Sequence, residues 1–195
     1  MILSEIDENK IYFTEKQIIN INKQQGVKKV LDIGGGGESI IAHLYGGKVI
    51  SIDLSKEELL EAEDNEALKI IMDARNMDFL DNQFDLCTSF FTFMYLEKSD
   101  YEKVFKEVKR VLKPEGKFII WDLSIPEKDR KDKDFYAVKL EVQFNNQKIN
   151  TAYGTYWKEN SQKFDEFVHL SNKNNLEVLK KDIDNHCFYL ELKNI

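Results

Sequence analysis

Short apolar runs alternate with helical patterns along most of this 195-residue chain, and this alternation limits the folds that it can adopt. The runs that have the length and composition of strands are 28–33, 48–53, 68–72, 84–90 and 116–123. Most of the gaps between them hold helical periodicity or capping signals. Strands that are separated by helices pair in parallel, with the helices on the faces of the sheet. The sequence therefore predicts an α/β fold.

The last third of the chain predicts a different end to the sheet. A helix expected at about 161–175 is followed by two strand-like runs, 176–183 and 187–193. Only three residues join the two runs, so they must be antiparallel. The clearest helix of the chain is expected to begin at Ser99, with Ser99 and Glu102 as a capping box.

The whole chain, residues 1–195, is of single-domain size, and its 42% hydrophobic content suffices for one core. We expect residues 1–27 to be an N-terminal helical segment, with one helix over 4–24 packed beside the ligand crevice. We expect residues 127–160 to be an insertion or hairpin that covers the substrate site.

The composition argues against several classes of protein. The net charge of −7 opposes a nucleic-acid footprint, which needs a basic face. No apolar run approaches the length of a membrane span, and the first residues do not have the pattern of a leader, so we expect a cytoplasmic protein that does not bind membranes. Cys87 and Cys187 lie in apolar runs away from metal-ligand spacing, which predicts buried free thiols and no metal site.

A glycine cluster marks the expected ligand site. Gly34 to Gly37 follow the first strand and Asp32, as in a turn that brings the backbone close to a ligand. Asp53 and Asp73 close the next two apolar runs, and a capping box of Ser55 and Glu58 starts a helix at the same edge. Ligands bind at this edge of open parallel sheets, outside the carboxyl ends of the strands.

These features, in this order, resemble the class I S-adenosylmethionine-dependent methyltransferases, and most closely their small-molecule "type 11" branch. The residues that carry the resemblance are the glycine loop, Asp53, Asp73-Ala74, Phe84-Asp85-Leu86 and Val111 to Gly116. The resemblance implies a Rossmann-like three-layer sandwich. Its mostly parallel seven-stranded sheet would have the order 3-2-1-4-5-7-6, with an antiparallel last strand.

The resemblance also implies how the cofactor, S-adenosyl-L-methionine, would be held. Asp32 and the backbone of the glycine loop would surround its methionine part, Asp53 would accept from both ribose hydroxyls, and Asp73 would accept from the adenine amine. An ionised carboxylate only accepts hydrogen bonds, which suits both partners. The implied cofactor-binding residues are Asp32, Gly34, Gly35, Gly36, Asp53, Leu54, Asp73, Ala74, Ser89 and Phe90.

The expected reaction is direct displacement of the methyl group by a small-molecule acceptor, with S-adenosyl-L-homocysteine as the product. The cofactor carries the reactivity, so the protein mainly aligns the reactants and no single catalytic residue is required. The chain has Ser89-Phe90-Phe91-Thr92 where similar enzymes that methylate amines have Asn/Asp-Pro-Pro-Tyr/Phe. Candidates for contact with the acceptor are Phe90, Tyr95, Tyr153, Trp157 and His186, the last also as a general base.

One residue departs from the family pattern. Glu38 stands where the family usually has a third glycine, with Gly37 before it and a helix after it. A carboxylate at a helix N-terminus is favoured by the macrodipole. The departure leaves open a protein that binds the cofactor without catalysis. An NAD-dependent oxidoreductase is a further alternative, but its fingerprint requires glycine at position 39, where this chain has Ser39.

Overall fold

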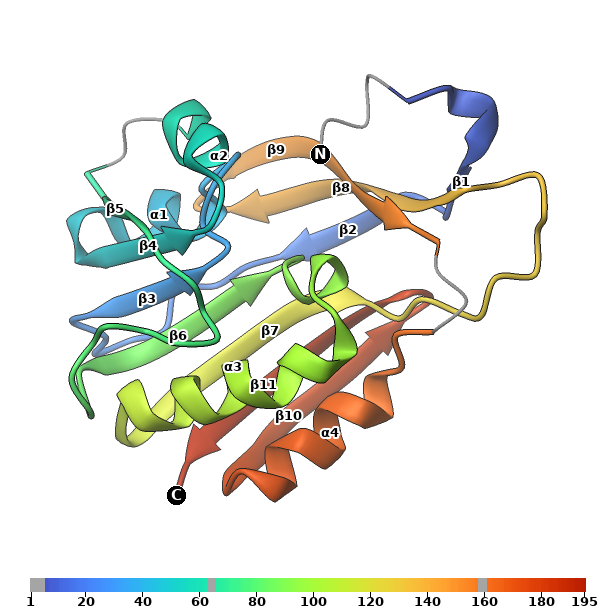
Figure 1. Cartoon of the computed structure of the whole chain (residues 1–195). Helices are drawn as coiled ribbons and strands as arrows, with labels where there is room; N and C mark the ends of the chain where they lie inside the picture. Colours follow the sequence, from blue (N-terminus) through green and yellow to red (C-terminus); the bar gives the residue numbers. More distant parts are fainter. Residues whose placement is uncertain (1–5, 63–65, 158–160) are drawn as a thin grey trace.

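The computed structural model describes residues 6–62, 66–157 and 161–195. Figure 1 shows the order of the elements along the chain. The helices are α1 (Ile40–Tyr45), α2 (Lys56–Glu61), α3 (Lys98–Val111) and α4 (Phe164–Lys173), with short 3-10 turns η2 (Glu8–Lys10), η3 (Gly46–Lys48) and η4 (Phe93–Tyr95). The strands are β1 (Ile11–Phe13), β2 (Gln17–Asn20), β3 (Val30–Ile33), β4 (Val49–Asp53), β5 (Leu68–Ile71), β6 (Phe84–Phe90), β7 (Leu112–Leu123), β8 (Phe135–Phe144), β9 (Gln147–Tyr156), β10 (Leu176–Asp184) and β11 (Cys187–Asn194).

A seven-stranded central sheet has the order β10-β11-β7-β6-β3-β4-β5. All its neighbours from β7 to β5 are parallel, and β11 is antiparallel to both β7 and β10. Counted along the chain, this is the predicted order 3-2-1-4-5-7-6 with its antiparallel last strand. The predicted fold class is confirmed.

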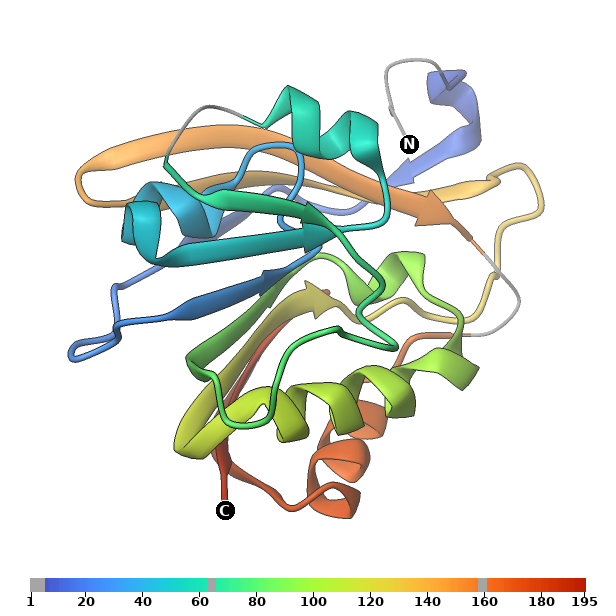
Figure 2. The same cartoon turned by 60° about the vertical axis from the view of Figure 1, so that its left-hand side comes forward.

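Helices α3 and α4 cover one face of the central sheet, and α1, α2 and a second sheet cover the other (Figures 1 and 2). Helix α3 buries Tyr101, Val104, Phe105 and Val108 on one stripe, which is the period that predicted it. Its start differs from the prediction. The N-cap is Glu97, without a side-chain cap, so the Ser99 and Glu102 capping box is wrong.

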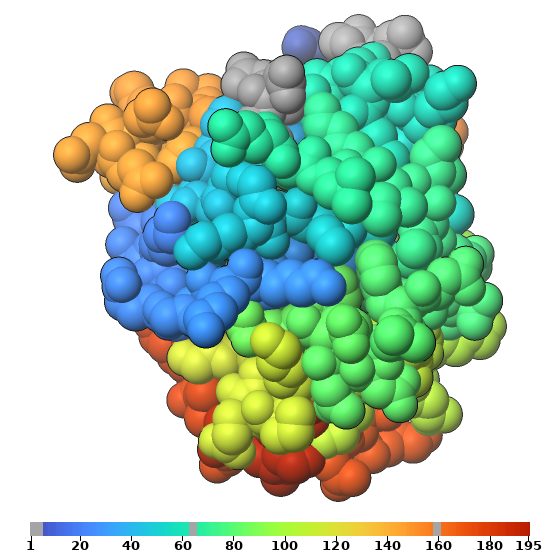
Figure 3. All heavy atoms as spheres, turned by 90° about the vertical axis from the view of Figure 1, so that its left-hand side faces the viewer, coloured from blue at the N-terminus to red at the C-terminus, as the bar shows by residue number. Residues whose placement is uncertain are grey.

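The second sheet is built on the hairpin of β8 and β9. Strand β8 pairs with β9 on one side and with β1 and β2 in parallel on the other. The hairpin turn is Asn145-Asn146, with both residues left-handed (φ 46° and 61°), as a two-residue turn requires. The segment around this turn, in orange, projects from the side of the molecule at the upper left of Figure 3. The predicted hairpin in 127–160 is confirmed, whereas its position over the substrate site stays a prediction.

The predicted N-terminal helix is wrong over the described residues 6–24, because this segment contains η2, β1 and β2. Ile11, Tyr12, Phe13, Ile18 and Ile19 are β-branched or aromatic residues that fit a pleated strand. Their pairing with β8 outweighs the helical pattern that we inferred locally. Residues 4–5 lie outside the described part of the chain.

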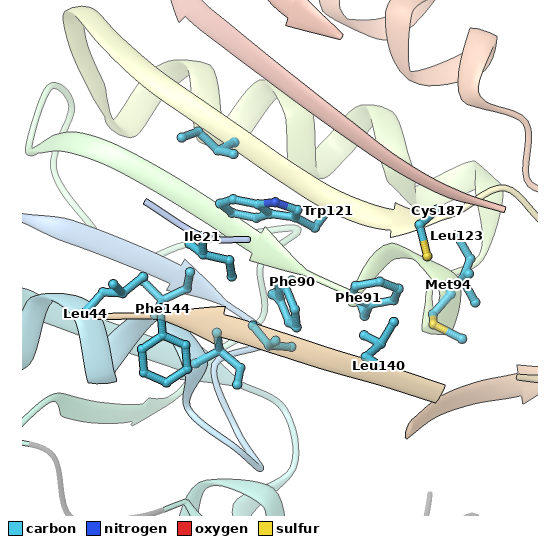
Figure 4. Packing of buried hydrophobic residues seen from close by; sticks show 14 of the residues in the cluster. Ile21, Leu44, Phe90, Phe91, Met94, Trp121, Leu123, Leu140, Phe144 and Cys187 are labelled. Atoms are coloured by element: carbon cyan, nitrogen blue, oxygen red, sulfur yellow. The ribbon is translucent and has the colours of Figure 1, made fainter. Parts of the chain in front are cut away.

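The second sheet is packed into the core and does not stand free of it. Alternate residues of β8, from Tyr136 through Val138, Leu140 and Val142 to Phe144, are at most 4% exposed. They meet Phe90 and Trp121 of the central sheet in one cluster with Met94, Leu123 and Cys187 (Figure 4). Cys87 and Cys187 are buried free thiols, as predicted.

Candidate cofactor and acceptor site

The glycine loop connects β3 to α1 and lies close to other parts of the chain. Gly34 and Gly37 are left-handed, with φ of 71° and 54°. A Cβ on Gly34 would lie 2.3 Å from Thr92 Oγ1, and one on Gly36 would lie 2.5 Å from Glu58 Cβ. The protein's own packing therefore requires glycine here. Backbone N–H groups of Gly34 and Gly35 donate to Ile52 O at 2.8 and 3.2 Å, which fixes the loop over β4.

Asp32 lies beneath this loop. It is 3% exposed, and its Oδ1 accepts from Thr88 Oγ1 at 2.7 Å. A Cβ on Gly35 would come within 2.7 Å of its other oxygen. Burial raises the pKa of Asp32 to about 7, which the hydrogen bond from Thr88 only partly offsets. Asp32 thus packs against the loop at Gly35, while its predicted contact with the cofactor stays a prediction.

Asp53 ends β4 beside the loop. Its Oδ1 accepts from the backbone N–H of Ser55 at 2.8 Å. Its Oδ2 faces the loop, 3.3 Å from the position of a Cβ on Gly36. Ser55 caps α2 as predicted, with its Oγ accepting from Glu58 N at 3.1 Å. The neighbouring Leu54 is 57% exposed, so an acceptor oxygen and an apolar surface lie together at this edge.

Asp73 has a partner that the sequence did not predict. Arg75 donates to it from its backbone N–H and from Nε and Nη2, at 2.7–3.0 Å. Arg75 also donates to Asp100 at the start of α3, at 2.7 Å. These side-chain hydrogen bonds from Arg75 hold the pKa of Asp73 below its usual value. The Asp73 oxygens are thereby engaged inside the protein, and their predicted role at the adenine amine stays a prediction.

The carboxyl end of β6 forms the next part of the site. Phe90 is 7% exposed and faces the second sheet, whereas the side chain of Ser89 faces the opposite side, because neighbours on a strand alternate. Phe91 is left-handed with φ of 53°. Thr92 Oγ1 then donates to Ile33 O at 2.9 Å, which joins the end of β6 to the start of the glycine loop.

Strand β9 brings Tyr153 to the same place. Its ring lies parallel to that of Phe91, with centroids 5.1 Å apart, and edge-on to that of Phe90 at 5.9 Å. Its hydroxyl donates to Glu38 Oε2 at 2.7 Å. Tyr95 of η4 lies nearby and is 45% exposed. Three of the five acceptor-site candidates, Phe90, Tyr95 and Tyr153, are therefore close to the loop.

The other two candidates form a separate cluster around Tyr136. The Trp157 ring lies 5.0 Å from that of Tyr136, and Trp157 Nε1 donates to Pro126 O at 2.9 Å. His186 Nδ1 lies 2.9 Å from the Tyr136 hydroxyl. Trp157 is 4% exposed, so packing accounts for it.

Sequence reasoning missed Asp122 at the end of β7. It is fully buried and accepts from the backbone N–H groups of Phe93 and Leu123, each at 2.8 Å, and from Gln162 Nε2 at 2.9 Å. Burial raises its pKa to about 7. An acid inside the apolar run Ile119-Ile120-Trp121-Asp122-Leu123 was the available signal. Asp122 positions η4, which carries Tyr95, next to β7.

None of the helices in residues 6–62, 66–157 and 161–195 is long and apolar enough to cross a membrane. In the same residues no cluster of three or more His, Cys, Asp or Glu side chains could hold a metal ion.

The fold is that of S-adenosylmethionine-dependent methyltransferases. A solved structure of such an enzyme from Methanosarcina mazei superposes with a TM-score of 0.63 at 16% identity, covering 89% of this chain and 94% of that one. Residues 31–120 match the family model described as "Methyltransferase domain". These residues match that family, as the resemblance predicted, and S-adenosylmethionine is the cofactor that this match implies.

Curated relatives match over the same core. A sterol 4-C-methyltransferase of Caenorhabditis elegans is 31% identical over 125 residues, which are 58% of this chain and 37% of that protein. A phosphoethanolamine N-methyltransferase of Plasmodium falciparum is 33% identical over 132 residues, which are 63% of this chain and 48% of that protein. The chain thus spans less than half of the length of these two relatives.

Proposed function

We propose that this protein transfers the methyl group of S-adenosylmethionine to a small-molecule acceptor. The observation that carries the proposal is the Oδ2 of Asp53, which faces the glycine loop beside the exposed Leu54. A carboxylate next to an apolar surface suits a ribose diol and its attached base. The match of residues 31–120 to a methyltransferase domain supports the same conclusion.

The residues present fit the cofactor in part. The glycine-loop backbone and Asp53 would hold its methionine and ribose parts, and Leu54 would lie against its base. Ala74 offers a backbone N–H next to Asp73. When bound, the cofactor supplies an electrophilic methyl group whose transfer needs alignment and exclusion of water. Phe90, Phe91 and Tyr153 give that region apolar walls.

We also infer a small organic acceptor that reaches the protein in the cytosol. The two curated relatives are named for different acceptors, a sterol and phosphoethanolamine, and are small-molecule methyltransferases by those names. The net charge of −7 disfavours nucleic acid as the acceptor, because phosphates repel an acidic surface. Of the alternatives, an NAD-dependent oxidoreductase is disfavoured by the family match of residues 31–120.

Calorimetric titration tests the proposal. Protein freed of carried-over ligand is titrated in parallel with S-adenosylmethionine, S-adenosylhomocysteine and NAD. We expect the two adenosyl compounds to bind with micromolar affinity and NAD not to bind. Formation of S-adenosylhomocysteine over a panel of small acceptors then establishes turnover. Binding of NAD alone would overturn the proposal, and tight binding without turnover over broad panels would establish the non-catalytic alternative.

A further inference from the structure

We infer that Glu38 is a positioning residue that fastens strand β9 to the glycine loop, so that cofactor binding at the loop also orders β9. The inference rests on the proposed function, because it concerns the same glycine loop. It assigns a role to the residue that departs from the family pattern and to strand β9 of the hairpin.

Both oxygens of the Glu38 carboxylate are used by β9. Oε1 accepts from Thr151 Oγ1, and Oε2 accepts from the Tyr153 hydroxyl at 2.7 Å. Thr151 and Tyr153 are two residues apart, so their side chains lie on the same face of the strand. Burial raises the pKa of the Tyr153 hydroxyl well above its usual value, and the Glu38 charge raises it further, so the hydroxyl stays a donor.

These contacts exclude the simpler explanation, that Glu38 serves the helix that follows it. The N-cap of α1 is Ser39, which has a left-handed backbone and no side-chain cap. Helix α1 has only six residues, and the Glu38 oxygens accept from two residues of β9, 113 and 115 positions further along the chain. A charge that served only the helix dipole would not need two hydroxyl partners on a distant strand.

The Glu38 contacts link the end of the glycine loop to β9 and, through Tyr153, to the end of β6. Tyr153 stacks on Phe91, and the next residue, Thr92, bonds to Ile33 O and packs against Gly34 at the start of the loop. The loop is therefore held at its start through β6 and at its end through β9. Tyr153 takes part in both the contact with Glu38 and the contact with Phe91. A change in the conformation of the loop should therefore alter the ordering of β9.

Hydrogen exchange measured by mass spectrometry, with and without saturating S-adenosylhomocysteine, tests the inference. The quantity compared is the ligand-induced change in exchange of a peptide covering 147–157, with the loop peptide covering 30–45 as the reference. E38G restores the usual glycine and removes the contact, and Y153F removes one donor while keeping the ring. Y156F is the matched control, because Tyr156 lies on the same strand, is 59% exposed and has its ring next to that of Phe135, with centroids 4.4 Å apart.

In the unmodified protein and in Y156F we expect the ligand to slow exchange at least fivefold in both peptides. In E38G the loop should remain protected while the change in β9 is lost, and in Y153F the change in β9 should be reduced. If E38G does not fold, E38Q replaces it, because glutamine keeps the shape of the side chain and one acceptor oxygen. E38Q should also reduce the ligand-induced change in exchange of β9.

Two results would overturn the inference. One is protection of the loop without protection of β9 in the unmodified protein, and the other is protection of β9 that persists in E38G or, if E38G does not fold, in both E38Q and Y153F. A structural role alone would change the basal exchange of β9 and leave its response to ligand intact. Absence of protection in every peptide would instead show that the ligand does not bind, which overturns the proposed function and this inference with it.

Discussion

Replacing Asp53 with asparagine should weaken S-adenosylhomocysteine binding without unfolding the protein. Oδ1 of Asp53 already accepts from Ser55 N–H at 2.8 Å, and an asparagine oxygen can keep this bond and so preserve the start of α2. The second oxygen becomes an NH₂ group, which cannot accept from a ribose hydroxyl. The substitution therefore removes the acceptor that the proposed function requires and little else.

The magnitude follows from the one bond that is lost. A hydrogen bond to a charged acceptor contributes about 1.5 to 3 kcal/mol, which corresponds to about a 10- to 150-fold rise in Kd. Isothermal titration calorimetry at equal ionic strength measures this change. Glu61 on α2 is exposed, so E61Q is a control that alters the net charge equally without touching the crevice.

The reasoning fails if D53N binds S-adenosylhomocysteine within twofold of the unmodified protein while its unfolding midpoint is unchanged. Asp53 would then serve only to hold Ser55. An equal loss of affinity in E61Q would show instead that general electrostatics, and no local acceptor, governs binding.

Three further predictions concern buried positions. G35A should lower the free energy of unfolding by about 1 to 3 kcal/mol, since its Cβ would lie 2.8 Å from Ser51 Cβ and Oγ, both buried; an unchanged urea midpoint would contradict this. Burial raises the pKa of Asp32 to about 7, so the folded state keeps a proton that the unfolded chain loses near pH 4. The free energy of unfolding should therefore fall by about 1.4 kcal/mol per pH unit between pH 5 and 7 relative to D32N. The same pH dependence in both proteins would show that the pKa of Asp32 is not raised. Burial also raises the pKa of the Cys87 thiol, and that of Cys187 to about 12, so both should resist thiol reagents at pH 8 until the protein unfolds; rapid labelling of the native protein would show otherwise.

The central sheet could be predicted because its signals are local. Each of the seven strand-like runs became a strand of the sheet, with ends within about four residues of the prediction, since each run is bounded by turn or capping residues. The order of the strands came from the family resemblance. The sequence also predicted Ser55 as the cap of α2 and Asp53 at the end of the preceding strand. Both are local features, because each side chain accepts from a backbone N–H two or three residues further on.

Two of the errors and omissions involve partners that are distant in sequence. The N-terminal segment became strands because β8, more than 120 residues away, offers an edge to pair with. Glu38 could be recognised as unusual, but its partners lie 113 and 115 positions away. Asp73 is different, because its partner Arg75 is only two residues further on; the sequence predicted a cofactor role for Asp73 and did not show that Arg75 donates to its oxygens and links it to Asp100.

The register of the second sheet links two features that would otherwise look independent, the hairpin turn and the glycine loop. Asn145 and Asn146 set the pairing of β8 with β9, in which Val138 lies opposite Tyr153. A slip of one residue on β9 would turn Thr151 and Tyr153 to the opposite face, away from Glu38 and Phe91. The same slip on β8 would turn Tyr136, Val138 and their alternate neighbours out of the core. Burial of the β8 side chains therefore fixes the register, and the register in turn presents the hydroxyls of β9 to the loop.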